Sequence, residues 1–424
     1  MQMENSDKNK KCIFAGRFQP FHNGHLEAIK WILANHCGEI MIAIGSLQEC
    51  STKENPFSFD ERKTMLEAAL AGVGIKNYRI FGLPDFKDDS VWTNKFLQLA
   101  GSSLDEAVVF SLNPWTKKCC EKVGIKVMEQ PSFFDQLSAT QIREKIFKEE
   151  EWESLVPKEI SEYLKSSGKD QKIKNLQMPP EERIIDFIKQ KVKEAGAKGA
   201  VIGISGGIDS AVAAVLAKKA LGKKILCLSL PFSKKNPFKK NVSALERSLK
   251  IKIAEKPIEE MFKAIEKRLP KGPDLARGNI QSRIRMVILY HYAGINNYLV
   301  LGTTNRSEME IGYFTKYGDG GVDMEPIADI YKTDLYPIAK RIGVPKEILG
   351  AIPTAGLWAG QTDEKELGLS YFQLDTILKL LSQGFGKEEI SFLTGLSKRS
   401  VEKIEKRRSA NAHKLSLPPA CKLG

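Results

Sequence analysis

The loop SGGIDS at residues 205–210 is the stretch whose residue types and spacing best suit chemistry. Two glycines let a polyphosphate lie against the main chain, and the free N–H groups of a helix start attract anions. The loop is not a Walker A, which requires a lysine followed by Ser or Thr after its second glycine. Asp209 beside a phosphate fits a bound Mg²⁺ that offsets the repulsion. An ordinary glycine turn capped by Asp209 and Ser210 is the alternative.

The residues on either side predict the elements that position this loop. The apolar run at 200–202, continued by Ile204, is short and β-branched, which favours a buried parallel strand. Residues 211–221 are rich in alanine and have apolar positions at helical spacing, and Gly222 can end a helix there. A strand, a glycine loop and a helix therefore follow one another.

His22 and His25 form a second pair with chemical potential. An apolar run at 11–15 predicts a strand before them, and Leu26, Ile29 and Ile32 repeat at helical spacing behind them. Two imidazoles three residues apart at a helix start can donate hydrogen bonds to one phosphate and stabilise a transferring phosphoryl group. A metal pair lacks nearby third and fourth ligands in the sequence. Histidines with a purely structural role remain the other alternative.

A capping-box pattern, in which Ser138 is followed three residues later by Gln141, predicts a helix start at Ser138. The cap could be its whole purpose. Alternatively, free N–H groups, hydroxyls and the Arg143 guanidinium converge on the outer phosphates of a nucleotide. A strand at 39–45 closes a βαβ unit in the same half of the chain.

In the second half, a strand at 225–230 and another at 298–302 continue a parallel-sheet pattern. The later strand delivers Thr303 and Glu308 to its carboxyl end, where ligands of open parallel sheets bind. Arg283 and Arg285 stand two apart and should diverge on a helix. The run FTKYGDGGVD at 314–323 is too polar and glycine-rich for core.

Composition limits the class of protein. The 424 residues, of which 42% are hydrophobic and 28% charged, predict a soluble α/β protein of two domains. A net charge of +13 attracts polyanions such as ATP, dinucleotides or RNA. Seven cysteines without paired CxxC spacing indicate reduced thiols. No signal-like or bilayer-spanning run is visible, so we expect a cytoplasmic protein without membrane contact.

The polar stretch at 165–182, with its Gly and Pro pair, predicts a linker between domains at 1–164 and 183–424. Strands alternate with helices on both sides of it. The fold class that follows is α/β, with two Rossmann-like domains built on parallel sheets.

The first domain resembles the archaeal-type nicotinamide mononucleotide adenylyltransferases, which have a nucleotidyltransferase fold. The resemblance is carried by GRFQPFHNGHL at 16–26, Asn55-Pro56-Phe57 with Glu61-Arg62, Asp85, Trp92, residues 111–114 and residues 138–143. Ala139 stands where the family usually has glycine. The resemblance implies ATP-phosphate binding and catalysis by Arg17, His22, His25 and Arg143, nucleotide binding by Asn113, Ser138 and Thr140, and pyridine-mononucleotide binding by Asp85 and Trp92.

The second domain resembles the ammonia-dependent NAD synthetases of the N-type ATP pyrophosphatase superfamily, because SGGIDS is joined by FTKYGDGG and by Ala412-His413-Lys414. The resemblance implies Mg²⁺ binding by Asp209 and Glu308, and catalytic roles for Asp209 and Lys332. It further implies ATP binding by Gly203, Ile204, Ser205, Gly206, Gly207, Ile208, Asp209, Ser210, Thr303, Lys332 and Thr354, and deamido-dinucleotide binding by Arg283, Lys316, Asp323, His413 and Lys414.

Together the resemblances imply a bifunctional enzyme of NAD biosynthesis. One domain would adenylylate a pyridine mononucleotide with ATP, and the other would amidate deamido-NAD through an acyl adenylate. With no sequence room for a glutaminase, ammonia is the expected nitrogen donor, and a homo-oligomer, at least a dimer, is expected through the second domain. The alternatives are amidation of nicotinate mononucleotide before adenylylation, a tRNA-binding or tRNA-modifying protein, and a nucleotide-binding regulator with inactive sites; our prediction includes no nucleic-acid partner.

Overall fold

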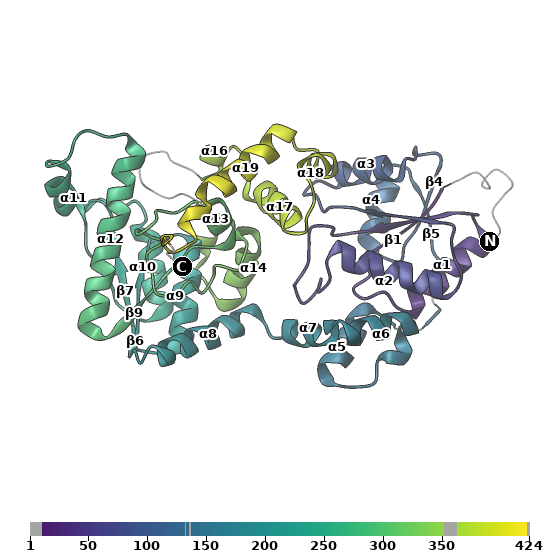
Figure 1. Cartoon of the computed structure of the whole chain (residues 1–424), viewed down its shortest axis with the longest axis horizontal. Helices are drawn as coiled ribbons and strands as arrows, with labels where there is room; N and C mark the ends of the chain where they lie inside the picture. The colour runs from purple at the N-terminus through teal and green to yellow at the C-terminus, as the bar shows by residue number, and fades with distance from the viewer. Residues whose placement is uncertain (1–10, 132, 135–136, 352–362, 422–424) are drawn as a thin grey trace. The chain divides into compact units, whose positions relative to one another are not determined.

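A computed structural model describes residues 11–131, 133–134, 137–351 and 363–421. The chain divides into two compact units (Figure 1). Unit 1 is Met1–Pro179 with Lys379–Lys398, and unit 2 is Pro180–Leu378 with Arg399–Gly424. The division after Pro179 lies inside the stretch predicted as a linker. The segment Lys379–Lys398, which the sequence placed in the second domain, belongs to unit 1.

Unit 1 is built on a five-stranded parallel sheet with the strand order β3-β2-β1-β4-β5. Strand β1 lies at its centre, and Phe14 is in register with Ile42 on one side and Phe110 on the other. The strands predicted at 11–15 and 39–45 are confirmed. The five strands are β1 (Lys11–Gly16), β2 (Ile40–Ile44), β3 (Tyr78–Gly82), β4 (Ala107–Phe110) and β5 (Lys126–Met128).

Alternate residues of this sheet are buried on opposite faces, as expected where helices cover both sides. Phe14 and Ile42 pack with α1, α2, α5, α6 and α7, whereas Ile13 and Met41 pack with α3 and α4. The helices are α1 (Asn23–Asn35), α2 (Phe59–Gly72), α3 (Asp89–Ala100), α4 (Pro114–Lys122), α5 (Ala139–Lys148), α6 (Lys158–Ser166), α7 (Lys169–Gln177) and, from the later segment, α18 (Lys387–Thr394).

The stretch expected to be a linker is largely helical. It contains α7, whose Ile173 is buried in the core of unit 1, and the start of α8 (Pro180–Glu194). The Lys169 and Lys172 ammonium groups pair with the Glu61 carboxylate on α2. The sequence hid this helix because most of its residues are polar, so its apolar period is weak.

Unit 2 has a four-stranded parallel sheet with the order β8-β7-β6-β9. Alternation again buries both faces. Ile202 and Cys227 pack against α8, α9 (Ile208–Leu221) and α14 (Lys332–Ile342). Val201 and Val300 pack against α11 (Glu259–Glu266) and the long helix α12 (Asp274–Asn296; Figure 1). The strands are β6 (Gly199–Gly203), β7 (Ile225–Ser229), β8 (Ile253–Glu255) and β9 (Tyr298–Leu301), which confirms the strands predicted at 225–230 and 298–302.

The helix predicted at 211–221 is confirmed as α9 (Ile208–Leu221), with Gly222 at its end. It begins three residues earlier than predicted, because Gly207 ends the turn. The other helices of unit 2 are α8 (Pro180–Glu194), α10 (Lys239–Leu249), α11 (Glu259–Glu266), α12 (Asp274–Asn296), α13 (Arg306–Ile311), α14 (Lys332–Ile342), α15 (Lys346–Leu349), α16 (Asp363–Leu367), α17 (Tyr371–Ser382, whose last residues belong to unit 1) and α19 (Lys398–Asn411, whose first residue belongs to unit 1).

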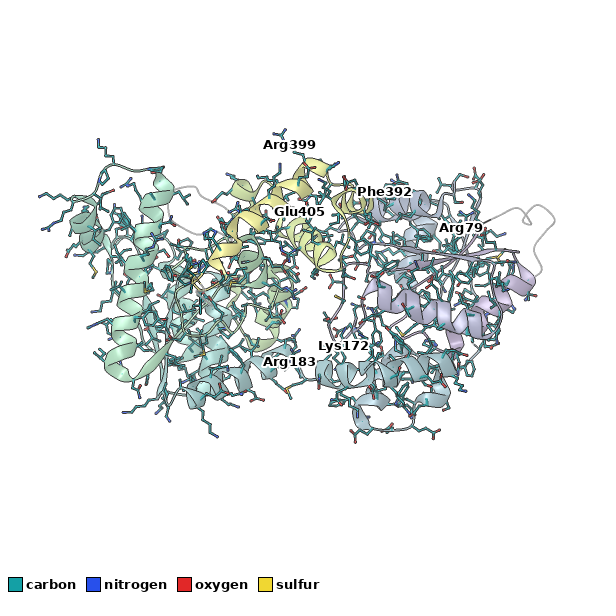
Figure 2. All side chains as sticks on the ribbon, in the orientation of Figure 1. Arg79, Lys172, Arg183, Phe392, Arg399 and Glu405 are labelled. Carbon is teal, nitrogen blue, oxygen red and sulfur yellow. The ribbon has the colours of Figure 1, made fainter. Side chains whose placement is uncertain are left out.

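The basic charge of the chain is carried largely at the surface. Arg79, Arg183 and Arg399 are exposed (Figure 2), and Arg79 pairs with Glu39 at 3.3 Å. None of the helices within the described residues has both the length and the apolar character needed to cross a bilayer.

The tight start of β6 gives a test of the unit 2 sheet. A Cβ on Gly199 would lie 2.1 Å from the main-chain oxygen of Lys224, which the strand pairing holds in place. Gly199→Ala should therefore lower the free energy of unfolding by roughly 2 kcal/mol or more. Gly294→Ala is the matched control, since Gly294 is exposed in α12 with open space around its Cβ, and it should be neutral or stabilising. Chemical denaturation measures both, and equal effects would contradict the packing described.

Candidate functional site

The glycine loop of unit 2 connects the end of β6 to the start of α9, at the carboxyl edge of the sheet. The Ser205 N–H donates to Ser210 Oγ (3.3 Å), and the Gly207 N–H donates to Ser205 Oγ (3.2 Å). Gly206 has a φ of +90°, in the left-handed region that favours glycine. This turn places Asp209 in the first turn of α9.

A buried lysine lies between two carboxylates at this edge. Lys332, the first residue of α14, places its Nζ 2.5 Å from Asp209 Oδ2 and 3.7 Å from Glu308 Oε1. Only 3% of the Lys332 side chain is exposed. Three residues that lie far apart in the sequence and that the resemblance assigned to ATP or Mg²⁺ therefore meet at one place.

The charges in this cluster depend on one another. Burial disfavours the charged ammonium of Lys332, but the carboxylates of Asp209 and Glu308 outweigh it and raise the pKa of Lys332. Burial, together with the repulsion from Asp209, raises the pKa of Glu308. The ammonium can bind phosphate oxygens, and the two carboxylates are the ligand type that Mg²⁺ takes alongside substrate phosphates.

Asn305 is part of this site, although the sequence analysis did not select it. Its Nδ2 donates to Asp209 Oδ1 (2.9 Å), and its Oδ1 accepts from the Glu308 N–H (3.0 Å). The Glu308 carboxylate in turn accepts from the Asn305 N–H (3.2 Å), which completes a capping box at the start of α13. The spacing of an Asn followed three residues later by a Glu could have revealed this pair.

Two further acids carried no local sequence signal, and one of them, Asp363, lies close enough to act on the charges of Lys332 and Glu308. The Asp363 carboxylate accepts from the Tyr371 hydroxyl (2.9 Å), and the Tyr371 ring centroid lies 5.1 Å from Lys332 Nζ. The Glu325 carboxylate accepts from the Thr304 N–H (3.1 Å) and hydroxyl (3.0 Å), and burial raises the pKa of Glu325 to about 8. Both acids contact elements that are distant in the chain, so only the fold brings them in.

Some of the residues predicted to bind the dinucleotide contact one another. The Arg283 guanidinium donates to the Lys316 carbonyl (3.3 Å), and Lys316 Nζ donates to the His413 carbonyl (2.5 Å). Lys414 Nζ donates to the Gly312 and Phe314 carbonyls (2.7 and 2.9 Å). The C-terminal segment of unit 2 is thereby joined to the glycine-rich loop at 314–323.

The Asp323 carboxylate is held differently, since it accepts from the Tyr290 hydroxyl (3.0 Å) and from the Val300 N–H (2.7 Å). Thr303 lies two residues after the end of β9, and Thr354 lies outside the described residues. Arg283 and Arg285 do diverge on α12: Arg283 is exposed, and the half-buried Arg285 donates to the Leu230 carbonyl (2.9 Å).

In unit 1, His22 is the N-cap of α1, and its ring stacks on that of His25 with centroids 3.6 Å apart. The His22 N–H donates to His25 Nδ1 (3.3 Å), so a neutral His25 ring carries its proton on Nε2. Burial lowers the pKa of His22 to about 4, and burial with the nearby His22 lowers that of His25 well below its ordinary value. Both imidazoles are therefore neutral at pH 7.

Arg143 lies in the first turns of α5, which begins after the N-cap Ser138 with the predicted capping box. Its guanidinium donates to the Gln19 carbonyl (2.6 Å) and to the Thr140 hydroxyl (3.2 Å). Within the part of the chain that the structure describes, Arg143 Nε and His22 Nδ1 are buried without a hydrogen-bond partner. Buried polar atoms seldom lack partners, so these two are suited to a ligand.

The remaining predicted residues of unit 1 have mixed surroundings. The exposed Arg17 lowers the pKa of Arg143 and opposes the burial-driven rise in the pKa of Asp85, which places it near both. Asn113 caps α4 by accepting from two N–H groups, including that of Trp115 (2.9 Å). Trp92 is 3% exposed, stacked on Phe96 and in edge contact with Trp115.

Arg62 was noticed only as part of a motif, yet it organises unit 1. Its fully buried guanidinium donates to the Arg17 (3.2 Å), Gly45 (2.6 Å) and Ser46 (3.1 Å) carbonyls, and its Nε donates to the Ser58 carbonyl (3.2 Å). The Ser46 hydroxyl then donates to Asp85 (3.3 Å). Arg62 thus joins the loop after β1 to the loop after β2, and Ser46 in that second loop bonds Asp85.

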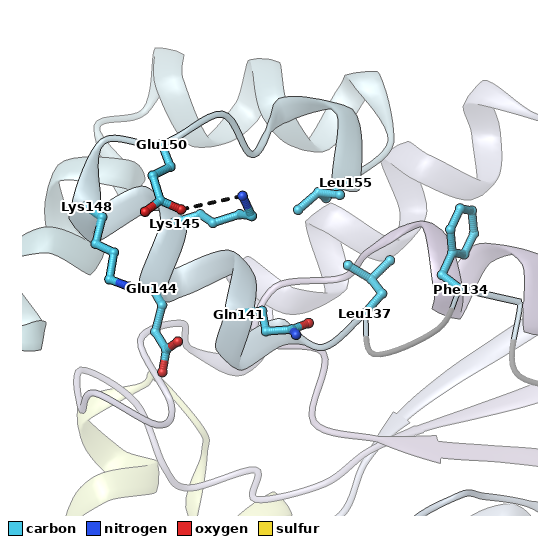
Figure 3. A pocket seen from close by; sticks show the side chains of 8 residues that line it. All are labelled: Phe134, Leu137, Gln141, Glu144, Lys145, Lys148, Glu150 and Leu155. Carbon is cyan, nitrogen blue, oxygen red and sulfur yellow. Dashed lines mark ion pairs between the residues drawn. The ribbon is translucent and has the colours of Figure 1, made fainter.

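A pocket of about 380 Å³ lies on another side of α5 (Figure 3). Phe134, Leu137 and Leu155 form its apolar end, and a Lys145–Glu150 ion pair (3.5 Å) borders it. Leu137, Gln141 and Glu144 each adjoin a predicted site residue in the sequence, but Arg143 and the histidines do not line the pocket. This pocket is therefore separate from the predicted phosphate site.

Comparison with known proteins supports both halves of this description. The family model described as NAD synthase matches residues 181–418, and the model described as cytidylyltransferase-like matches residues 13–83. NH(3)-dependent NAD(+) synthetase of Methanosarcina mazei is 42% identical over 247 residues, covering 57% of this chain and 96% of the relative. The same enzyme of Pyrococcus horikoshii is 47% identical over 242 residues, covering 56% and 91%.

Among solved structures, NMN synthetase from Francisella tularensis is similar, with 33% identity and a TM-score of 0.51 over 57% of this chain and 98% of that one. The class of protein is thus a synthetase unit on a parallel sheet, joined to a cytidylyltransferase-like domain. The chain belongs to the NAD synthase family.

The contacts of Arg62 lead to a stability prediction. Arg62→Met removes four hydrogen bonds from a fully buried guanidinium to main-chain carbonyls and should lower the free energy of unfolding of unit 1 by about 3 kcal/mol or more. Lys63→Met, on the same helix, removes only an exposed pair with Glu67 and should change it by less than about 0.5 kcal/mol. Hydrogen exchange of β1 and β2 under denaturant follows the unit selectively, and unchanged protection in the Arg62 variant would contradict the role.

Proposed function

We propose that this chain is a bifunctional enzyme of NAD biosynthesis, whose unit 1 adenylylates a pyridine mononucleotide and whose unit 2 amidates deamido-NAD with ammonia. The observation that carries the proposal is the convergence of Lys332, Asp209 and Glu308 beside the glycine loop of a chain in the NAD synthase family. The unpartnered His22 Nδ1 and Arg143 Nε support the assignment of unit 1.

In unit 1, the 5′-phosphate of the mononucleotide attacks the α-phosphorus of ATP, and pyrophosphate leaves. His22, His25, Arg17 and Arg143 position the phosphates and donate hydrogen bonds to the charge that develops, so no covalent enzyme intermediate is needed. Ser138, Thr140 and Asn113 complete the nucleotide site. Asp85 and Trp92 face the pyridine mononucleotide in this proposal.

In unit 2, the nicotinate carboxylate attacks the α-phosphorus of ATP, so that an acyl adenylate forms and pyrophosphate leaves. Ammonia then adds to the acyl carbon, and AMP leaves. The adenylation is needed because a free carboxylate is a poor acyl donor. Lys332 neutralises charge on the departing pyrophosphate, while the loop N–H groups at 205–210 bind the phosphates.

Asp209 and Glu308 fit the Mg²⁺ that such chemistry implies, since both carboxylates face the same ammonium. Mg²⁺ would supply charge neutralisation on the ATP phosphates. Among the described residues, no group of three or more His, Cys, Asp or Glu side chains is arranged to hold a metal alone, so the phosphates of ATP are expected to provide further ligands.

Binding of the dinucleotide by Arg283, Lys316, Asp323, His413 and Lys414 remains part of the proposal, as does ATP binding by Thr303 and Thr354. We also propose a homo-oligomer, at least a dimer through unit 2. The apolar side chains of Val287 and Ile295, both on α12, are more than half exposed, which suits a protein contact.

A second order of reactions is favoured by the likeness to NMN synthetase from Francisella tularensis. Here unit 2 would amidate nicotinate mononucleotide, and unit 1 would adenylylate the amide. Because unit 1 activity would mix the two routes, the comparison requires a chain inactivated by His22→Asn with His25→Asn. Ammonia-dependent AMP release from deamido-NAD against that from the mononucleotide then identifies the preferred substrate.

The deciding experiment is product analysis by mass spectrometry after incubation of the intact chain with nicotinate mononucleotide, ATP, Mg²⁺ and ammonia. NAD and AMP are the expected products, and omission of ammonia should leave deamido-NAD. If neither amide nor adenylylated product forms, the proposal fails. Salt-sensitive, tRNA-selective binding in the same preparation would favour the RNA-binding alternative.

The lowered pKa values of the two histidines predict the pH dependence of unit 1. Because His22 is protonated only below about pH 4 and His25 also stays neutral, neither should titrate in the free enzyme between pH 5.5 and 8. The kcat/KM for ATP should therefore show no inflection near 6.5, the ordinary histidine value. An inflection there that disappears in His22→Asn would contradict the prediction.

A further inference from the structure

A carboxylate on α17 bridges the two helices that carry Glu308 and Lys332. Asp375 is 2% exposed, and its Oδ1 accepts a hydrogen bond from the Ser307 hydroxyl. Its Oδ2 accepts from the Thr333 N–H (2.9 Å) and from the Thr333 hydroxyl (2.8 Å). Three donors from two helices thus meet one buried carboxylate.

These contacts cap the start of α14, which receives no side-chain cap from its own N-cap residue. Its N-cap residue, Tyr331, offers no side-chain hydrogen bond to the helix. Instead the Lys332 N–H donates to Ser307 Oγ (2.9 Å), and the Thr333 N–H donates to Asp375. Helix starts leave N–H groups unpaired and carry positive dipole charge, so a buried carboxylate is favoured there.

On both helices, the residues bonded to Asp375 are sequence neighbours of the residues in the Lys332 cluster. Ser307 directly precedes Glu308, and Thr333 directly follows Lys332. A shift of either helix start would change the distances of 2.5 and 3.7 Å that place Lys332 Nζ against Asp209 and Glu308. Displacements of about 1 Å are costly in a catalytic site.

We propose that Asp375 is a positioning residue of the synthetase reaction, which fixes the Lys332 ammonium relative to Glu308 by holding Ser307 and the start of α14. The inference rests on the proposed function of unit 2. The proposed role of Asp375 requires no contact with ATP or the dinucleotide, because it acts through Ser307 and Thr333. Asp375 links the helices that carry Glu308 and Lys332, so its loss should slow formation of the acyl adenylate rather than lower the number of competent sites.

The test compares Asp375→Asn with Thr376→Val in the full chain. Asn keeps the size of the side chain but loses the charge and one acceptor. Thr376 is the neighbouring buried residue on α17, and its hydroxyl donates within the helix to the Phe372 carbonyl (2.8 Å). Single-turnover AMP formation from deamido-NAD, ATP and ammonia gives the rate constant, and its amplitude counts competent sites.

We expect the rate constant of Asp375→Asn to fall by about 10- to 100-fold, as for other residues that orient a site from behind it, with unchanged amplitude. Thr376→Val should stay within about twofold of the parent chain. A retained rate in Asp375→Asn, or a loss of amplitude with an unchanged rate constant, overturns the inference. Thr333→Val, which removes one of the three donors, should give a smaller fall and serves if Asp375→Asn does not fold.

Hydrogen exchange provides a readout that does not depend on activity. The amides of Lys332 and Thr333 should exchange faster in Asp375→Asn, and those of β6 should not. If the parent chain forms no AMP, the proposed function of unit 2 fails, yet the exchange result still tests the bridge. If AMP forms and exchange at α14 is unaltered in the variant, the inference alone fails.

Discussion

The ammonium of Lys332, enclosed with two carboxylates at the edge of the unit 2 sheet, is the interaction on which the rest of that unit depends. A buried ion pair stabilises a fold only when its geometry is good, and removing one partner costs roughly 3–5 kcal/mol. The elements around the cluster accordingly hold each partner: the glycine loop presents Asp209, Asn305 bonds both acids, and α14 begins at Lys332 itself. These contacts offset the desolvation of the buried charges, and the same arrangement suits the binding of ATP and a cation.

Unit 1 also contains a buried cation that is held by the elements around it, but the residues differ. There the cation that organises the loops is Arg62, which bonds main-chain carbonyls at the ends of β1 and β2. His22 and Arg143 keep buried polar atoms unpartnered within the described residues, which leaves these atoms available to a ligand. In both units the groups converge beyond the carboxyl ends of parallel strands, where such sheets leave space for ligands.

The sequence predicted what depends on local pattern. Apolar runs located β1 and β9, the alanine-rich stretch located α9, and the Ser138 to Gln141 spacing located the start of α5. It missed what depends on distant contacts: Arg62, Asp363 and Asp375 have no local motif that reveals their partners. The helix α7 was missed because its burial depends chiefly on Ile173, too little for a periodic signal. The roles of Lys332 and Glu308 were predicted from the family resemblance, whereas the network that holds them is seen only in the fold.

The central claim is that Lys332 stabilises the charge on the pyrophosphate of ATP. It is tested most directly by exchange of labelled pyrophosphate into ATP, measured with deamido-NAD and Mg²⁺ and without ammonia, with and without Lys332→Gln in a parent chain whose unit 1 is inactivated by His22→Asn and His25→Asn. We expect exchange in this parent chain and a loss of about 10²-fold or more when Lys332→Gln is added. Exchange at the parent rate in Lys332→Gln would contradict it.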